Sequence, residues 1–80
     1  MSIDKDYRVM IHRGDTLLAT YTLHTEFEDG EFVDVSSSYT VGEPDSDPIE
    51  EEAVEAILKT EAAHGKENIN GYTLEWFLLN

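Results

Sequence analysis

The stretch TLLATYTLHTEFEDGEFVDVSSSYTV, residues 16–41, decides the fold, because its apolar side chains recur at every second position over two segments. The apolar members of residues 16–25 and 31–41 that share this parity are Leu17, Ala19, Tyr21, Leu23, Val33, Val35, Tyr39 and Val41. A period of two in segments rich in Val, Thr and Tyr is typical of β-strands with one buried face. The stretch therefore predicts two strands of a hairpin.

Both strands keep their apolar side chains at odd positions, so the turn between them must place odd residues opposite odd residues. A two-residue turn at Asp29-Gly30 would pair Leu23 with Ser36 and mix the faces. We therefore predict a three-residue loop, Glu28-Asp29-Gly30, with Gly30 in the left-handed position. The expected pairs are Thr25 with Val33, Leu23 with Val35 and Ala19 with Tyr39. By the same argument, Arg13-Gly14-Asp15 is expected to be a three-residue connection to an earlier strand.

Outside this stretch, residues 7–12 and 72–79 also alternate and predict a first and a last strand. Between them, Asp47 is expected to cap a helix that has Pro48 in its first turn and Glu50 completing a capping box. The helix is expected to run to about His64 and to end at Gly65, and residues 66–71 are expected to form a polar turn. The prediction is an α+β two-layer sandwich: a four-stranded, mostly antiparallel sheet with one helix, in the order βββαβ.

The chain has 80 residues and is expected to form a single compact domain, 1–80. The formal net charge is −13, and no Lys or Arg occurs between Arg13 and Lys59. That block holds thirteen acids, while the remaining five acids and five bases cancel, so the whole net charge comes from residues 14–58. Clustered carboxylates repel phosphates, so neither nucleic acid nor an anionic membrane is expected as a direct partner. A basic protein is the expected complement.

The sequence contains only weak matches to known binding, catalytic or metal-binding motifs. Arg13-Gly14-Asp15 matches the integrin tripeptide, but a tight turn explains it better. The Asp45-Ser-Asp47 segment fails the EF-hand spacing, and the three histidines are expected to lie far apart without any cysteine to help them bind zinc. Ser36 to Ser38 are expected to lie in a strand with no base beside them. We therefore predict no catalytic residues, no metal site, no cofactor and no enzyme.

No disulfide framework is available without cysteine, and no apolar leader or membrane span is evident, so we expect a cytoplasmic protein. In size, compactness and charge the chain resembles the small acidic inhibitors encoded by bacteriophages and mobile elements, such as DNA-mimicking anti-restriction proteins and anti-CRISPR proteins. The resemblance implies that carboxylates occupy the basic nucleic-acid-binding surface of a target. Two alternatives remain: an immunity or antitoxin protein for a basic nuclease toxin, and a halophile-type acidic domain without such a target.

Selective binding also needs apolar anchors among the charges. Phe32 and Phe77 are expected on the sheet face away from the helix, where they could bind the partner or meet in a homodimer. Trp76 is expected in the core because its parity matches Tyr72 and Leu74. The expected partner-binding residues are Glu26, Glu28, Asp29, Glu31, Asp34, Glu43, Asp45, Glu51, Glu52, Glu55, Phe32 and Phe77.

Overall fold

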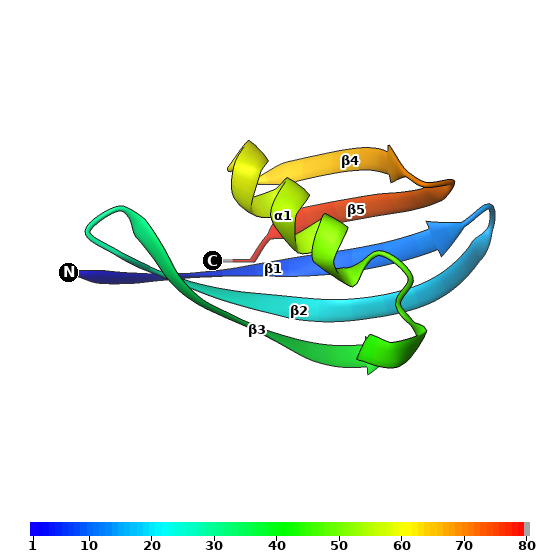
Figure 1. Ribbon diagram of the computed structural model, residues 1–80, viewed down its shortest axis with the longest axis horizontal. Helices are drawn as coiled ribbons and strands as arrows, with labels where there is room; N and C mark the ends of the chain where they lie inside the picture. Colours follow the sequence, from blue (N-terminus) through cyan, green and yellow to red (C-terminus); the bar gives the residue numbers. More distant parts are fainter. Residues whose placement is uncertain (80) are drawn as a thin grey trace.

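The computed structural model describes residues 1–79 and consists of one sheet with one helix against it (Figure 1). In chain order the elements are β1 (Ser2–Arg13), β2 (Thr16–Glu28), β3 (Glu31–Val41), the 3₁₀ turn η1 (Pro44–Ser46), α1 (Glu50–Thr60), β4 (His64–Ile69) and β5 (Tyr72–Leu78). The strands lie in the order β3-β2-β1-β5-β4, and every neighbouring pair is antiparallel. The α+β class and the antiparallel sheet are confirmed, but the sheet has five strands and the order is βββαββ rather than βββαβ.

The strand that the sequence analysis missed is β4, which contains most of the expected polar turn. It pairs with β5 through a tight turn at Asn70-Gly71, where both residues have positive φ (52° and 85°). Gly65 does not cap the helix, because it lies in β4 directly opposite Trp76, and a Cβ at that position would collide with the indole ring. The helix ends earlier than expected, with Glu61 in the left-handed conformation donating its N–H to the carbonyl of Ile57.

The hairpins satisfy the parity requirement by a route that the sequence analysis did not consider. In both hairpins the turn has two residues, and a β-bulge follows in one strand. At the Asp29-Gly30 turn, Phe27 pairs with Phe32, and Val33 is the extra residue that restores odd-to-odd pairing. The expected three-residue loops are therefore wrong, as is the expected register. The observed pairs are Thr25 with Val35, Leu23 with Ser37, Tyr21 with Tyr39 and, in the first hairpin, Ile11 with Ala19 and His12 with Leu17.

The bulges move three apolar side chains to the face opposite the expected one, because a residue shares its face with the residue it pairs with. Leu17, before the bulge at Leu18, pairs with His12 and lies on the face away from α1, where it is 40% exposed. Val41 pairs with Thr20 after a second bulge in β3 and is also 40% exposed on that face. Phe32 moves the other way, to the helix side.

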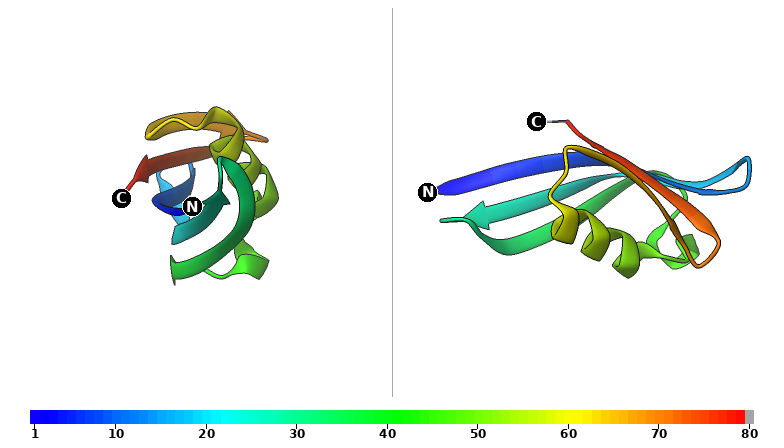
Figure 2. Two further views of the ribbon diagram at one scale, coloured as in Figure 1. Left: turned by 90° about the vertical axis from the view of Figure 1, so that its left-hand side faces the viewer. Right: turned by 90° about the horizontal axis from the view of Figure 1, so that it is seen from above.

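The core lies between the sheet and α1, which crosses one side of the sheet from the end of β3 toward β4 (Figure 2). Its buried apolar side chains are Tyr7, Val9, Ile11, Ala19, Tyr21, Leu23, Ile49, Ala53, Ile57, Leu74 and Trp76. The expectation for Trp76 is confirmed: it is 1% exposed, and its indole N–H donates to the carbonyl of Ala62 at 3.1 Å. The helix is shorter than the sheet, so the β2–β3 turn and the first residues of β1 project beyond it.

The start of α1 is held by a tyrosine rather than by the expected capping box. Ile49 is the N-cap residue and makes no side-chain cap, while the Asp47 carboxylate accepts the backbone N–H of Ile49 at 3.0 Å. The Tyr39 hydroxyl lies 2.9 Å from Asp47 Oδ2 and 2.8 Å from Glu50 Oε2. Its ring packs on Tyr21 with 4.5 Å between centroids. This contact ties β3 to the helix start.

The two tyrosines of this contact differ in how their hydroxyls are satisfied. The buried Tyr21 hydroxyl has no hydrogen-bond partner among residues 1–79, whereas the Tyr39 hydroxyl lies within hydrogen-bond distance of two carboxylates. Burial, reinforced by the negative charges of Asp47 and Glu50, raises the pKa of Tyr21. Burial and the hydrogen bonds to Glu50 and Asp47 raise the pKa of Tyr39. Both phenols therefore stay protonated in the folded protein at pH values where the unfolded chain loses those protons.

We predict that the two Tyr→Phe substitutions differ in their effect on stability at neutral pH. Tyr39→Phe should lower the free energy of unfolding by about 1–3 kcal/mol, because it leaves two carboxylates without their donor. Tyr21→Phe removes an unsatisfied hydroxyl and should leave stability unchanged or raised. Above pH of about 10, wild-type stability should fall as pH rises, because only the unfolded chain releases the protons, and each substitution should flatten that fall. Urea denaturation monitored by circular dichroism checks this; a larger loss for Tyr21→Phe than for Tyr39→Phe would contradict it.

Candidate functional site

The sheet face away from α1 carries rows of carboxylates on three neighbouring strands. Asp4, Glu26 and Asp34 lie directly opposite one another across β1, β2 and β3, and Glu28 pairs with Glu31 at the tip. Neighbouring strands lie about 4.8 Å apart, so these side chains stand side by side. We call these five residues the carboxylate rows. The Glu28–Glu31 pair flanks the β2–β3 turn, which projects beyond the helix (Figure 1).

Almost none of this charge is neutralised within the chain. In residues 1–79 the ion pairs are the N-terminal ammonium with Asp29 at 2.8 Å and His24 with Asp6 at 3.1 Å, and neither involves a carboxylate of the rows. Glu26 accepts a hydrogen bond from the Ser2 hydroxyl at 2.7 Å, which adds no charge. Like charges placed directly opposite in a sheet are destabilising. The carboxylate rows therefore lower the stability of the folded protein, and cations bound to them would raise it.

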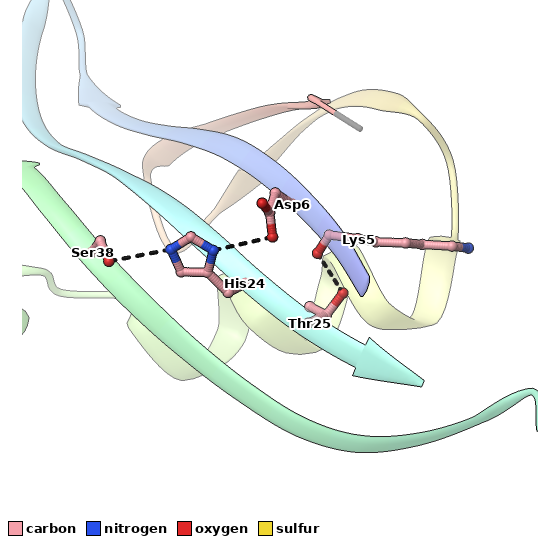
Figure 3. Close-up of polar contacts among 5 residues, drawn as sticks. All are labelled: Lys5, Asp6, His24, Thr25 and Ser38. Atoms are coloured by element: carbon pink, nitrogen blue, oxygen red, sulfur yellow. Dashed lines mark hydrogen bonds and ion pairs between the residues drawn. The ribbon is translucent and has the colours of Figure 1, made fainter. Parts of the chain in front are cut away.

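Next to the rows, three polar side chains form a chain across β1, β2 and β3 (Figure 3). Asp6 Oδ1 lies 3.1 Å from His24 Nδ1, and His24 Nε2 lies 3.2 Å from the Ser38 hydroxyl. A three-residue loop at Arg13-Gly14-Asp15 would set His24 opposite Asp4, and no base was expected beside Ser38. Both expectations are wrong, because the two-residue turns with their bulges place each partner two residues away from the expected one. On the other side of the sheet, the Thr25 hydroxyl donates to the Lys5 carbonyl at 2.8 Å.

The Asp6–His24–Ser38 chain has the connectivity of an acid, a base and a nucleophile. Acyl transfer also needs N–H donors aimed at the developing oxyanion. The backbone N–H groups of a sheet lie in its plane and point at neighbouring strands, so they do not converge on a carbonyl above Ser38. The imidazole is also accessible to solvent, since the His24 side chain is 42% exposed. The geometry favours a structural role, in which His24 joins β1 to β3 beside the carboxylate rows.

The structure separates the two aromatic residues that were expected on one face. Phe77 does lie on the face away from α1, opposite Arg8 and beside His64, which begins β4 rather than ending the helix. Phe32 lies on the helix side, where its ring meets Phe27 with 5.9 Å between centroids. The two phenylalanines therefore cannot meet across a homodimer formed by one sheet face. Phe32 is 44% exposed, because α1 does not extend over it.

The remaining expected site residues fall into two places. Asp29 forms the β2–β3 turn next to the carboxylate rows, and it is exposed. The acids of residues 43–55 lie in the other layer: Glu43 and Asp45 flank or form η1, and Glu51, Glu52 and Glu55 are exposed on α1. The structure therefore brings together Glu26, Glu28, Glu31 and Asp34 and adds Asp4, which the sequence analysis missed. It does not bring the two acidic segments together into one surface.

Two further findings bear on the chemistry of the described residues. In residues 1–79, no group of three or more His, Cys, Asp or Glu side chains has a metal-binding arrangement. Within the same residues, no helix has both the length and the apolar character needed to cross a bilayer.

The carboxylate rows make a prediction about stability. Glu26→Gln should raise the free energy of unfolding by about 0.2–1 kcal/mol at low salt, because it removes the central charge of a like-charge row. The gain should shrink at high salt, where exposed charges are screened. Glu75→Gln is the matched control: Glu75 lies on the same face between Met10 and Lys66, so neutralising it should leave stability unchanged or lower. Urea denaturation at two salt concentrations measures both, and a loss of stability in Glu26→Gln would contradict the prediction.

Comparison with known proteins found no relative: no family model, curated protein or solved structure matches the chain.

Proposed function

We propose that this protein is a small acidic inhibitor that blocks the basic nucleic-acid-binding surface of a target protein by charge mimicry. The observation that carries the proposal is the set of carboxylate rows, Asp4–Glu26–Asp34 and Glu28–Glu31, opposed across three strands without a Lys or Arg partner in residues 1–79. A surface that served only solubility would intersperse both signs of charge. Here like charges are aligned, which costs stability unless a cationic surface covers them.

The rows suit this function because the backbone holds them in place. The carboxylates stand on three paired strands, so their spacing is set by the sheet rather than by mobile loops. A preorganised charge array loses little conformational freedom on binding, which favours affinity. It would accept the Lys and Arg side chains that otherwise contact phosphates, and nucleic acid would be excluded by competition. Complementary fields would also speed the encounter.

The proposal is for binding rather than catalysis, because the Asp6–His24–Ser38 arrangement stands on an exposed sheet face whose backbone N–H groups point at neighbouring strands. Charge, size and these rows fit the class of inhibitors carried by bacteriophages and mobile elements, among them anti-CRISPR and anti-restriction proteins. The protein would then act in the cytoplasm of the host cell on a basic, nucleic-acid-binding protein or complex. It would not itself bind nucleic acid or a membrane.

Capture of a partner from a host lysate, with the protein immobilised, tests the proposal when two charge-reversed variants are compared. Glu26→Lys with Asp34→Lys should abolish capture of a basic partner, because both changes fall in one carboxylate row. Asp45→Lys with Glu52→Lys changes the net charge equally at exposed positions of the other layer and should retain capture. Identification by mass spectrometry should yield a nucleic-acid-binding protein. Equal capture by both variants and the wild type would contradict a role for the rows, and so would tight binding of nucleic acid to the isolated protein.

A further inference from the structure

Strand β3 forms one edge of the sheet, and it is long and has neither the lysine nor the proline that often protects such an edge. Its outer side presents backbone N–H and C=O groups that no strand in residues 1–79 pairs, and its side chains are exposed except for that of Tyr39, which is half-buried. Proteins blunt edges with short strands, lysine or proline. The opposite edge strand, β4, is six residues long and carries Lys66, whereas β3 has eleven residues with neither lysine nor proline. Between its two bulges, residues 34–39 pair with β2 without a register shift, so their outer backbone groups alternate regularly along the edge.

A shallow apolar cavity, open to solvent, lies on the helix side of this edge. It has a volume of about 660 Å³ and lies between β3 and one flank of α1, with Val35, Val54 and Leu58 among its lining residues. Val35 is 37% exposed, so this strand residue is not covered by the helix. The exposed ring of Phe32 lies on the same face of β3, nearer the tip.

Both sides of the edge are negatively charged. The cavity is flanked by the carboxylates of Glu50, Glu51 and Glu55 and by one ammonium, that of Lys59. On the opposite face, Asp34 brings the carboxylate row to the edge strand itself. An extended segment placed along β3 would point alternate side chains to these two faces. Side chains on the helix side would contact the apolar cavity and the acidic side chains that flank it. Side chains on the other face would contact Asp34 and the carboxylate rows.

We propose that β3 receives an extended segment of the basic partner as a sixth strand of the sheet. In this arrangement, alternate apolar side chains of the segment enter the cavity beside Val35, and the intervening Lys or Arg side chains lie against Asp34 and the carboxylate rows. Backbone hydrogen bonds along the edge supply affinity, and the alternation supplies specificity. The inference rests on the proposed function for the basic character of the partner, but the edge and the cavity are independent of it.

Charge argues for a basic partner rather than a second copy of this chain. Each copy carries a net charge of −13, so two copies paired along β3 would bring two negatively charged surfaces together. Like charges on adjacent strands are destabilising. A segment that alternates apolar and basic residues would instead neutralise the row and fill the cavity.

A synthetic peptide that alternates valine and lysine is the probe, and its binding is measured by calorimetry. Two further peptides carry N-methyl groups on either the valine or the lysine amides. Because alternate amides of a strand point to opposite sides, one methylated form should lose binding by about tenfold or more and the other should keep it, as expected when several hydrogen bonds are lost together. Val35→Lys should weaken binding of the unmethylated peptide by about tenfold, since it fills the cavity mouth with a cation.

Val41→Lys is the matched control, because Val41 lies on the same strand, is similarly exposed and faces the other side. It should weaken binding much less than Val35→Lys. Equal binding of the two methylated peptides, or equal weakening by the two substitutions, would mean attraction by charge alone and would overturn strand addition, while leaving the proposed function to its own test on Glu26 and Asp34. A wild-type dimer that Val35→Lys dissociates would show that a second copy occupies the edge, which also overturns the inference.

Discussion

One eleven-residue helix must cover the apolar face of a five-stranded sheet, and the rest of the structure depends on that constraint. Every strand has to turn its apolar side chains toward α1, so pairing must preserve parity from strand to strand. Two-residue turns alone would break it, and the bulges at Leu18 and Val33 restore it. The Tyr39 hydroxyl, shared between Asp47 and Glu50, then fixes where the helix begins on this face.

The same constraint creates the surfaces that we assign to function. Because α1 is shorter than the strands, the β2–β3 turn and the start of β1 extend past it and expose both of their faces. Parity gives these faces different chemistry: acids such as Asp4 and Glu26 on one side, and aromatic rings such as Phe27 and Phe32 on the other. Edge strand β3 borders both. A basic segment with alternating apolar residues can satisfy both faces at once.

Alternation in the sequence was enough to predict the presence of β1, β2, β3 and β5 and the core position of Trp76, although β1 begins at Ser2 rather than at the expected residue 7. The helix was predicted from its capping signals. Alternation could not predict the bulges, because a three-residue loop and a two-residue turn with a bulge preserve parity equally well. That one ambiguity misplaced Phe32, and it set His24 opposite Asp4 instead of Asp6. Strand β4 was missed because its sequence, HGKENI, is polar, and its pairing depends on the tertiary contact between Gly65 and Trp76. The acidic character of the site could be predicted from the composition. Its arrangement in the carboxylate rows could not, because it depends on the register of the strands.

The central claim is that this protein and nucleic acid compete for one basic surface. The most direct test measures, by fluorescence anisotropy, whether a labelled nucleic acid is released from the captured partner as this protein is added, together with sedimentation analysis for a ternary complex. The account predicts complete release and no ternary complex, with the protein carrying Glu26→Lys and Asp34→Lys failing to compete. A stable ternary complex in which nucleic acid affinity is unchanged would contradict it.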